Sequence, residues 1–268
     1  MKRFDLLIEA DELLTKLGNK NLRIFDATIT DDVYLQEHLP GAAYFDHERF
    51  SDPASPYMCM IPSDTRLAEI IGEAGISNNS EVVLYACGMI PYAIRAWWVL
   101  KYAGHVNVRI LNGGLSAWKN AGGVTEQPPR QYEPAKFVGA VNPGMFANKE
   151  EVFASMNDEE VAIVNVLPSV SYEASHIPGS VNFSCMDLMQ GLDAILPDDE
   201  LAPRLDGMPK RKRIITYCGG GIAAAVNAAA YLLAGHENVA VYDGSMYEWL
   251  GEKMPVNGNG NWEIWKMK

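Results

Sequence analysis

The sequence predicts an α/β protein that contains the same folding unit twice. Short runs of β-branched and apolar residues, such as 81–86, alternate with longer helix-like segments. This alternation is typical of a parallel sheet that is covered by helices on both faces. Landmark residues also repeat, because Trp249 follows Gly235 at the same interval at which Trp118 follows Gly104. The 268 residues therefore divide into two halves of ordinary domain size.

The first half is expected to begin with an amphipathic helix, because leucines recur at helical spacing until Gly18 ends the pattern. Ser63 is expected to cap a later helix, and the apolar run at 81–86 is expected to be a buried strand ending at Cys87. In order, the expected elements are a helix at 6–17, a strand at 23–27, a turn at 38–42, a helix at 67–75, a strand at 81–86, a helix at 91–104, a strand at 108–111 and a helix around Trp118.

The pattern is interrupted between 124 and 144, where four prolines lie among polar residues. Such a stretch is typical of a linker. We therefore expect an N-terminal domain at 1–124, a linker at 125–144 and a C-terminal domain at 145–268 that contains the active cysteine.

The second half repeats the alternation of the first. Its turn at 176–180 corresponds to the turn at 38–42, and Cys218 precedes Gly235 by the interval at which Cys87 precedes Gly104. In order, the expected elements are a helix at 148–156, a strand at 161–166, a turn at 176–180, a short helix at 188–196, a strand at 214–217, a helix at 222–235, a strand at 239–242 and a short helix at 247–250.

Composition excludes several classes of protein. A net charge of −12 argues against nucleic acid or an anionic membrane as a partner. The sequence has no N-terminal apolar segment of signal type and no apolar run of membrane length. Its four cysteines are far apart and lack metal-ligand spacing, so we expect reduced thiols, no metal, no cofactor and a cytoplasmic location.

The most informative stretch is Cys218 with the residues that follow it, Gly219, Gly220, Gly221, Ile222 and Ala223. The stretch joins a buried strand to a buried helix, so its amides precede or begin a helix and have no intrahelical partner. Such amides and the helix dipole favour a negative charge, which makes a thiol there more acidic. Consecutive glycines leave the thiol accessible and allow the amides to form an anion-binding nest. We therefore expect Cys218 to be a nucleophile and residues 219–223 to bind its substrate.

The other cysteines are expected to have minor roles. Cys87 occupies the loop of the first half that corresponds to the Cys218 loop, but Pro91 removes one amide there, and packing is the favoured role. Cys185 is expected in the core because its neighbours are apolar. Cys59 is a candidate resolving thiol for Cys218.

Several motifs resemble the two-domain rhodanese family, which comprises thiosulfate and 3-mercaptopyruvate sulfurtransferases, and the resemblance covers nearly the whole chain. It implies two α/β domains, each with a five-stranded parallel sheet, and one active cysteine, here Cys218. It also implies transfer of a sulfane sulfur from a small anionic donor to cyanide or a thiol through a Cys218 persulfide. The motifs are the turns at 38–41 and 176–179, Ser55-Pro56-Tyr57, Arg95-Ala96-Trp97-Trp98, Leu111-Asn112-Gly113-Gly114 with Trp118, and Tyr242-Asp243-Gly244-Ser245 with Trp249.

The chain departs from this family around the cysteine. Thiosulfate enzymes have cationic residues where Gly219 and Gly220 stand, and mercaptopyruvate enzymes have a serine at Gly220 and a hydroxyl residue at Ala223. Where the family has Asp-x-Arg at the end of a strand, this chain has Asn165-Val166-Leu167, which contains no arginine. Cys59 stands where mercaptopyruvate enzymes have a histidine. The donor therefore stays open between thiosulfate and 3-mercaptopyruvate.

Three functions compete on these residues. The intact Cys218 loop favours a sulfurtransferase, whereas the missing arginines favour a carrier or sensor that holds a persulfide for a partner protein. A phosphatase of related fold requires Cys-x5-Arg, and Ala224 stands at the arginine position, which disfavours it.

Overall fold

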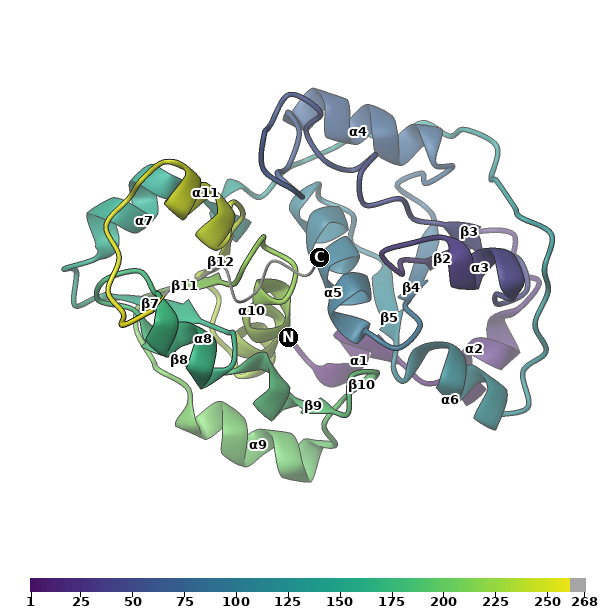
Figure 1. Ribbon diagram of the computed structural model, residues 1–268. Helices are drawn as coiled ribbons and strands as arrows, with labels where there is room; N and C mark the ends of the chain where they lie inside the picture. Colours follow the sequence, from purple (N-terminus) through teal and green to yellow (C-terminus); the bar gives the residue numbers. More distant parts are fainter. Residues whose placement is uncertain (261–268) are drawn as a thin grey trace. The chain divides into compact units, whose positions relative to one another are not determined.

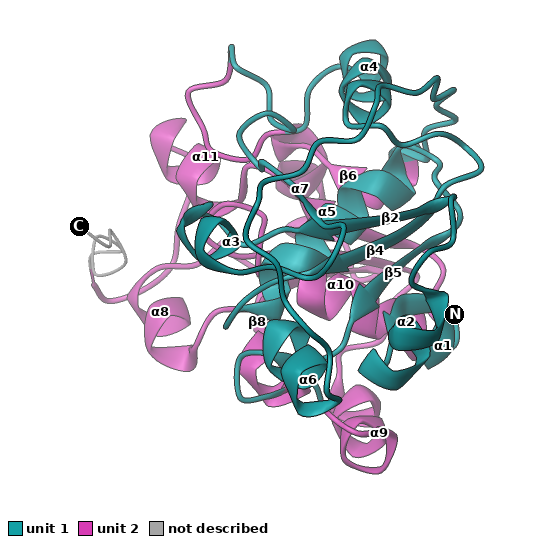
Figure 2. Ribbon diagram, turned by 90° about the vertical axis from the view of Figure 1, so that its right-hand side faces the viewer, with its two compact units in different colours: residues 1–54, 61–143, 190–195 teal, residues 55–60, 144–189, 196–268 magenta. Residues whose placement is uncertain are grey.

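The structure, a computed structural model, describes residues 1–260 and divides into two compact units (Figure 2). Unit 1 comprises 1–54, 61–143 and 190–195, and unit 2 comprises 55–60, 144–189 and the chain from 196 onward. Each unit therefore includes a short segment from the other half of the sequence. The domain boundaries expected at 124 and 145 stay a prediction about independent folding.

Unit 1 is built on a five-stranded parallel sheet (Figure 1). In spatial order its strands are β1 (Leu7–Ile8), β5 (Val108–Leu111), β4 (Glu81–Tyr85), β2 (Leu22–Asp26) and β3 (Ala43–Tyr44). Its helices are α1 (Arg3–Leu6), α2 (Ala10–Lys16), α3 (Asp32–Gln36), α4 (Asp64–Glu73), α5 (Ile90–Tyr102) and α6 (Gly114–Asn120).

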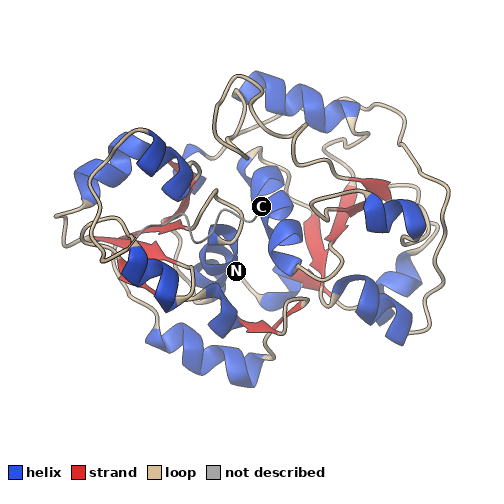
Figure 3. Ribbon diagram, in the orientation of Figure 1, coloured by secondary structure: helices blue, strands red, loops and turns tan. Residues whose placement is uncertain are grey.

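Unit 2 repeats this arrangement, with strands and helices again alternating along the chain (Figure 3). In spatial order its strands are β6 (Phe146–Ala147), β12 (Val239–Tyr242), β11 (Arg213–Tyr217), β7 (Val161–Asn165) and β8 (Val181–Asn182). Its helices are α7 (Lys149–Ser155), α8 (Ser169–Ala174), α9 (Asp198–Gly207), α10 (Ala224–Leu233) and α11 (Ser245–Gly251), with the 3-10 turns η1 (Pro143–Met145) and η2 (Cys185–Leu188).

The predicted fold class is confirmed by the two sheets. In each sheet the first strand pairs with the fifth, followed by the fourth, second and third, so the duplication extends to topology. Trp118 and Trp249 are both fully buried, and their indole N–H groups donate to the carbonyls of Val124 and Pro255 at 2.7 and 2.6 Å. These tryptophans are packing residues, as residues with a large apolar body and one polar group usually are in cores.

Two expectations about elements were wrong, and helices α3, α8 and α9 were not expected. The helix expected at 6–17 is interrupted by β1, where Leu7 and Ile8 are both buried and pair with the edge of β5. A helix packed on one side exposes its outer face, whereas a strand between two packed layers buries consecutive residues. The helix expected at 188–196 is instead a hairpin of β9 (Met189–Gln190) and β10 (Ala194–Ile195). Helix α9 was not expected, because it contains Pro203.

Among residues 1–260, no helix is long and apolar enough to cross a membrane.

Candidate active site

Cys218 directly follows β11, the middle strand of the unit 2 sheet. β11 is fully buried after Arg213 and pairs on both sides, with β12 and with β7. The strand ends at Tyr217, and the glycines that follow cannot continue a well-packed strand. Cys218 therefore lies at the carboxyl end of a central parallel strand, where ligands bind in open α/β sheets.

Ser245 binds the backbone of the Cys218 loop through its hydroxyl group. Its hydroxyl oxygen accepts hydrogen bonds from the amides of Cys218 and Gly221, both at 3.1 Å, and donates to the carbonyl of Tyr242 at 2.8 Å. Ser245 is fully buried and has a left-handed φ of 48°, which is unfavourable for a residue with a side chain. Strain of this kind is typical of functional sites and persists only where the surrounding structure enforces it.

The backbone at the start of α11 completes this support. Met246 N–H donates to the carbonyl of Cys218 at 3.1 Å, and Tyr247 N–H donates to the carbonyl of Gly219 at 2.9 Å. Gly221 has a φ of 78°, and a Cβ there would lie 2.5 Å from the carbonyl oxygen of Asp243. Only glycine fits at position 221 for both reasons.

The expectation that all of 219–223 offer free amides needs one correction. The Gly221 N–H is already bound to Ser245, because this bond fixes the loop on α11. Within the described chain, no acceptor is assigned to the amides of Gly219, Gly220, Ile222 and Ala223. Helix α10 begins at Ala224, so the last two of these amides precede its first turn, where N–H groups lack intrahelical partners.

The thiol is less accessible than expected. Cys218 is 3% exposed, because strands lie on both sides of β11 and α11 holds the backbone of Cys218 through both its amide and its carbonyl. Gly219, Gly220, Ile222 and Ala223 are half-buried, so the loop opens to solvent beyond the cysteine.

Cys185 is a neighbour of Cys218 that the sequence did not indicate. It is buried, as expected, and its amide donates to the carbonyl of Val166, whose own amide donates to Tyr217 just before Cys218. Burial, and then the nearby charge of Cys218, raise the pKa of the Cys185 thiol to about 12. A thiol with that pKa is protonated at neutral pH, so Cys185 is a poor nucleophile.

Strand register corrects the assignment of Cys87 as the counterpart of Cys218. Tyr85 and Tyr217 each end a central strand, and their hydroxyls accept the amides of Leu39 and Ile177 in the two corresponding turns. The residue after Tyr85 is Ala86, which therefore stands at the place of Cys218. The interval-based match missed this because the loop of unit 2 is one residue shorter.

Unit 1 lacks the features that surround Cys218. At the position of Ser245 it has Gly114, which keeps the left-handed φ, at 51°, but has no hydroxyl. Its loop amides at Cys87 and Ile90 donate to Thr28 Oγ1 and to the carbonyl of Leu192 at 2.9 and 2.8 Å, and the amide of Gly113 at the start of α6 donates to the carbonyl of Asp193 at 3.0 Å. Burial, and then the charge of Asp26, raise the pKa of the Cys87 thiol to about 12. The inert role favoured for Cys87 agrees with these contacts.

The remaining candidates have structural contacts. His38 and His176 stack on Tyr34 and Tyr172, and their Nδ1 atoms lie 2.7 Å from the carbonyls of those tyrosines, which agrees with a turn-forming role. Cys59 belongs to unit 2, is buried and has a left-handed φ of 61°. A partnership of Cys59 with Cys218 stays a prediction.

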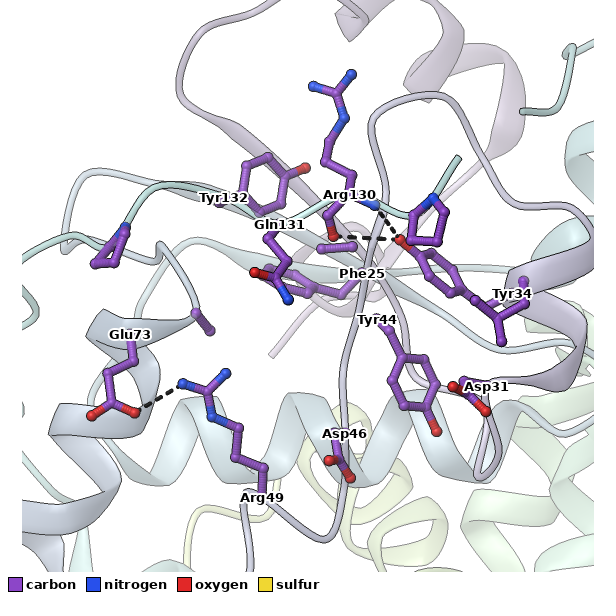
Figure 4. Close-up of a pocket in the computed structure, with 15 residues that line it drawn as sticks. Phe25, Asp31, Tyr34, Tyr44, Asp46, Arg49, Glu73, Arg130, Gln131 and Tyr132 are labelled. Atoms are coloured by element: carbon purple, nitrogen blue, oxygen red, sulfur yellow. Dashed lines mark hydrogen bonds and ion pairs between the residues drawn. The ribbon is translucent and has the colours of Figure 1, made fainter. Parts of the chain in front are cut away.

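A separate cavity of about 450 Å³ lies in unit 1 (Figure 4). Its aromatic walls include Tyr34 and Tyr132, whose hydroxyls are bound to backbone groups of Arg130 and Gly41 at 2.8 and 2.6 Å. Its lining has no cysteine, so it offers no thiol for sulfur transfer.

Sequence and structure comparisons place these features among known proteins. A family profile described as a rhodanese-like domain matches residues 9–121 and 148–252. Thiosulfate sulfurtransferase of Bos taurus is 32% identical over 238 residues, covering 83% of this chain and 80% of that protein. 3-Mercaptopyruvate sulfurtransferase of Escherichia coli (strain K12) is 28% identical over 263 residues, covering 90% of this chain and 94% of that protein.

Solved structures give the same result for the fold. The crystal structure of SseA from Escherichia coli, a 3-mercaptopyruvate sulfurtransferase, matches with a TM-score of 0.81 and 28% identity over 89% of this chain and 98% of that one. EanB, solved in complex with ergothioneine, matches with a TM-score of 0.83 over 97% of this chain and 71% of that one. Its identity is 22%, so this likeness concerns the fold alone.

Proposed function

This chain belongs to the rhodanese family and is a sulfurtransferase, and from that premise we propose that Cys218 carries the transferred sulfur as a persulfide. The observation that supports this most is the Cys218 loop, in which Ser245 holds two amides inward and four others have no assigned acceptor among the described residues. Hydrogen-bond donors that are fixed before reaction stabilise a developing anion without further reorganisation.

The first half-reaction forms the persulfide. The Cys218 thiolate attacks the outer sulfur of thiosulfate, a bond forms between the two sulfurs, and sulfite leaves with the electron pair of the broken S–S bond. With 3-mercaptopyruvate the carbon–sulfur bond breaks instead, and the carbon fragment takes the electron pair and a proton to become pyruvate. Both routes leave the same anionic persulfide on Cys218, facing the loop amides.

The second half-reaction returns the enzyme to its starting state. An acceptor attacks the outer sulfur of the persulfide, and the Cys218 thiolate leaves with the electron pair. Cyanide gives thiocyanate, and a thiol gives a new persulfide. No metal or cofactor is needed for either step, which agrees with the spacing of the cysteines.

The test combines a donor panel with two cysteine variants. Wild type incubated with thiosulfate or 3-mercaptopyruvate should gain the mass of one sulfur atom and should produce thiocyanate when cyanide is added. Cys218→Ser should lose both signals, with turnover reduced on the order of 10⁴-fold or more, as in other enzymes that lose a nucleophile. Cys87→Ser is the matched control and should behave like wild type. Turnover of Cys218→Ser near the wild-type rate would contradict the proposal.

A persulfide carrier or sensor is the second candidate. It is favoured by the absence of cationic and hydroxyl side chains from residues 219–223. A carrier would accept sulfur from a persulfidated partner protein, visible by intact mass, yet give no thiocyanate with either donor. Multiple turnovers with one donor would select the enzyme. Ala224 at the arginine position leaves the phosphatase without support.

We also propose a cytoplasmic location and no nucleic-acid partner, on the strength of the −12 net charge and the free thiols among the described residues. Cell fractionation and a DNA-binding assay at low salt test these two statements.

A further inference from the structure

The Cys218 loop has no side chain that could read the organic or oxyanion part of a sulfur donor. Residues 219–221 are glycines, and Ile222 and Ala223 are apolar. The loop amides can hold an anion, but an N–H group donates to any anion that reaches it. Selection among donors therefore depends on side chains outside residues 219–223.

Tyr247 is the side chain in the right place. It is the third residue of α11, five positions after β12 ends at Tyr242, and its amide donates to the carbonyl of Gly219. A Cβ built on Gly220 would lie 2.9 and 3.1 Å from Cδ2 and Cε2 of the Tyr247 ring. Among the described residues other than Gly220 and its two chain neighbours, no other heavy atom would lie within 4 Å of that Cβ.

The backbone does not explain why position 220 is glycine. Gly221 needs its left-handed φ, but Gly220 has no such φ and could hold an L side chain without strain. What a side chain at 220 would meet is the Tyr247 ring, because a Cβ there would lie 2.9 Å from Cδ2 and the ring would have to shift. Gly220 and Tyr247 are thus a complementary pair in which the ring fills the volume that a loop side chain would take.

The ring of Tyr247 lies beside the glycines of the loop. Its carbons nearest to Gly220 are Cδ2 and Cε2. Tyr247 therefore adds an uncharged wall there. The wall also narrows the space next to the loop, so a compact anion fits better than a longer carboxylate.

We propose that Tyr247 determines donor specificity at the Cys218 loop and favours thiosulfate over 3-mercaptopyruvate. This inference rests on the proposed persulfide function. It assigns the discrimination between the two sulfur donors to a side chain of α11, because the side chains of residues 219–223 cannot supply it.

The first experiment compares kcat/KM for the two donors in wild type, Tyr247→Ala and Tyr247→Phe. Truncation to alanine should lower the thiosulfate-to-mercaptopyruvate ratio by about tenfold, the usual scale for adding or removing volume in a substrate pocket. Phenylalanine keeps the ring edge and should keep the wild-type ratio. Phe153→Ala, which truncates an exposed aromatic side chain on α7, is the matched control and should also keep the ratio.

The second experiment is a double-mutant cycle on the pair. Gly220→Ala should reduce turnover with both donors because its methyl group meets the ring, and Gly220→Ala/Tyr247→Ala should recover turnover above the single Gly220→Ala variant. Additive effects in this cycle, or an unchanged donor ratio in Tyr247→Ala, would overturn the inference.

Intact mass separates this failure from a failure of the proposed function. If wild type gains no sulfur from either donor, the persulfide proposal is wrong and the specificity assignment falls with it. If wild type gains sulfur and Tyr247→Ala keeps the wild-type donor ratio, only the assignment to Tyr247 is wrong. Circular dichroism of each variant shows whether a loss of turnover reflects unfolding.

Discussion

At the residue scale, Ser245 contributes most to the geometry of the site. A single hydroxyl group binds two amides and one carbonyl, and it does so from a strained backbone conformation. A hydroxyl has two acceptor lone pairs and one donor, so all three hydrogen-bonding positions of Ser245 are used. The sequence placed this serine in a turn motif but did not indicate that its hydroxyl would bind the cysteine loop.

Removing that hydroxyl should affect stability and activity together. Ser245→Ala leaves the buried amides of Cys218 and Gly221 without an acceptor, so we expect the free energy of unfolding to fall by about 1–3 kcal/mol. Ser245→Gly loses the same bonds but relieves the left-handed backbone, and should be about 1 kcal/mol more stable than Ser245→Ala. Urea unfolding measures both values.

The exposed Ser169 at the start of α8 provides the control, since Ser169→Ala removes a hydroxyl that faces solvent. Persulfide formation should slow in both Ser245 variants and stay unchanged in Ser169→Ala. Equal stability of Ser245→Ala and wild type would contradict the role assigned to the hydroxyl.

His47 gives a pH dependence that can be tested separately. Burial lowers its pKa to about 4, opposed by the bond from Nε2 to the Ala27 carbonyl and reinforced by the charge of Arg95. Above about pH 6.5 the residue is neutral in both folded and unfolded chains. Between pH 6.5 and 4 the unfolded chain binds a proton that folded His47 does not, so stability should fall by about 3 kcal/mol over this range.

His47→Gln keeps a donor for Ala27 and removes the titration. Urea unfolding at several pH values should show a shallower loss of stability in this variant than in wild type below pH 6.5. Parallel curves for the two proteins would show that His47 is not the group responsible.

At the element scale, the β9–β10 hairpin is the main difference between the environments of the two loops. Its tip supplies the carbonyls that bind the loop amide of Ile90 and the amide of Gly113 at the start of α6. In unit 2 the corresponding amide of Gly221 is bound by Ser245 of α11. The two loops are therefore held by different elements, although the two sheets share one topology.

Shortening this hairpin should destabilise unit 1. Deleting 191–193 removes the acceptors of two amides, and each unsatisfied buried donor costs about 1–3 kcal/mol. Hydrogen exchange at Ile90 and Gly113 should become faster, which mass spectrometry or NMR can measure. Exchange in β11 of unit 2 serves as the internal reference, and unchanged protection of Ile90 would contradict the assigned contact.

The elements differ in how well the sequence predicted them. Central strands such as β11 were predicted closely because parallel strands buried on both faces form continuous apolar runs. β1 was missed because a two-residue edge strand is too short to show a period, and its pairing depends on the distant β5. Helix α9 was missed because Pro203 stands inside it, where proline is unfavourable.

At the scale of the whole molecule, the candidate site was predicted in part. Cys218 and its loop were proposed from the sequence because a cysteine followed by glycines between a strand and a helix is a local pattern. Ser245 and Tyr247 were not, because their contacts with the loop join residues that are distant in sequence. The one-residue difference between the two loops also required the strand register, since interval matching had aligned Cys87 with Cys218.

The exchange of 55–60 and 190–195 between the two halves of the sequence has a consequence for evolution and for engineering. A gene cut at the proline-rich connection would yield two fragments, and each would lack a short piece of its own fold. Recombination between related genes at that point would likewise combine each unit with a short segment from the other parent. Crossovers are therefore better tolerated where each short segment is exchanged together with the unit to which it belongs.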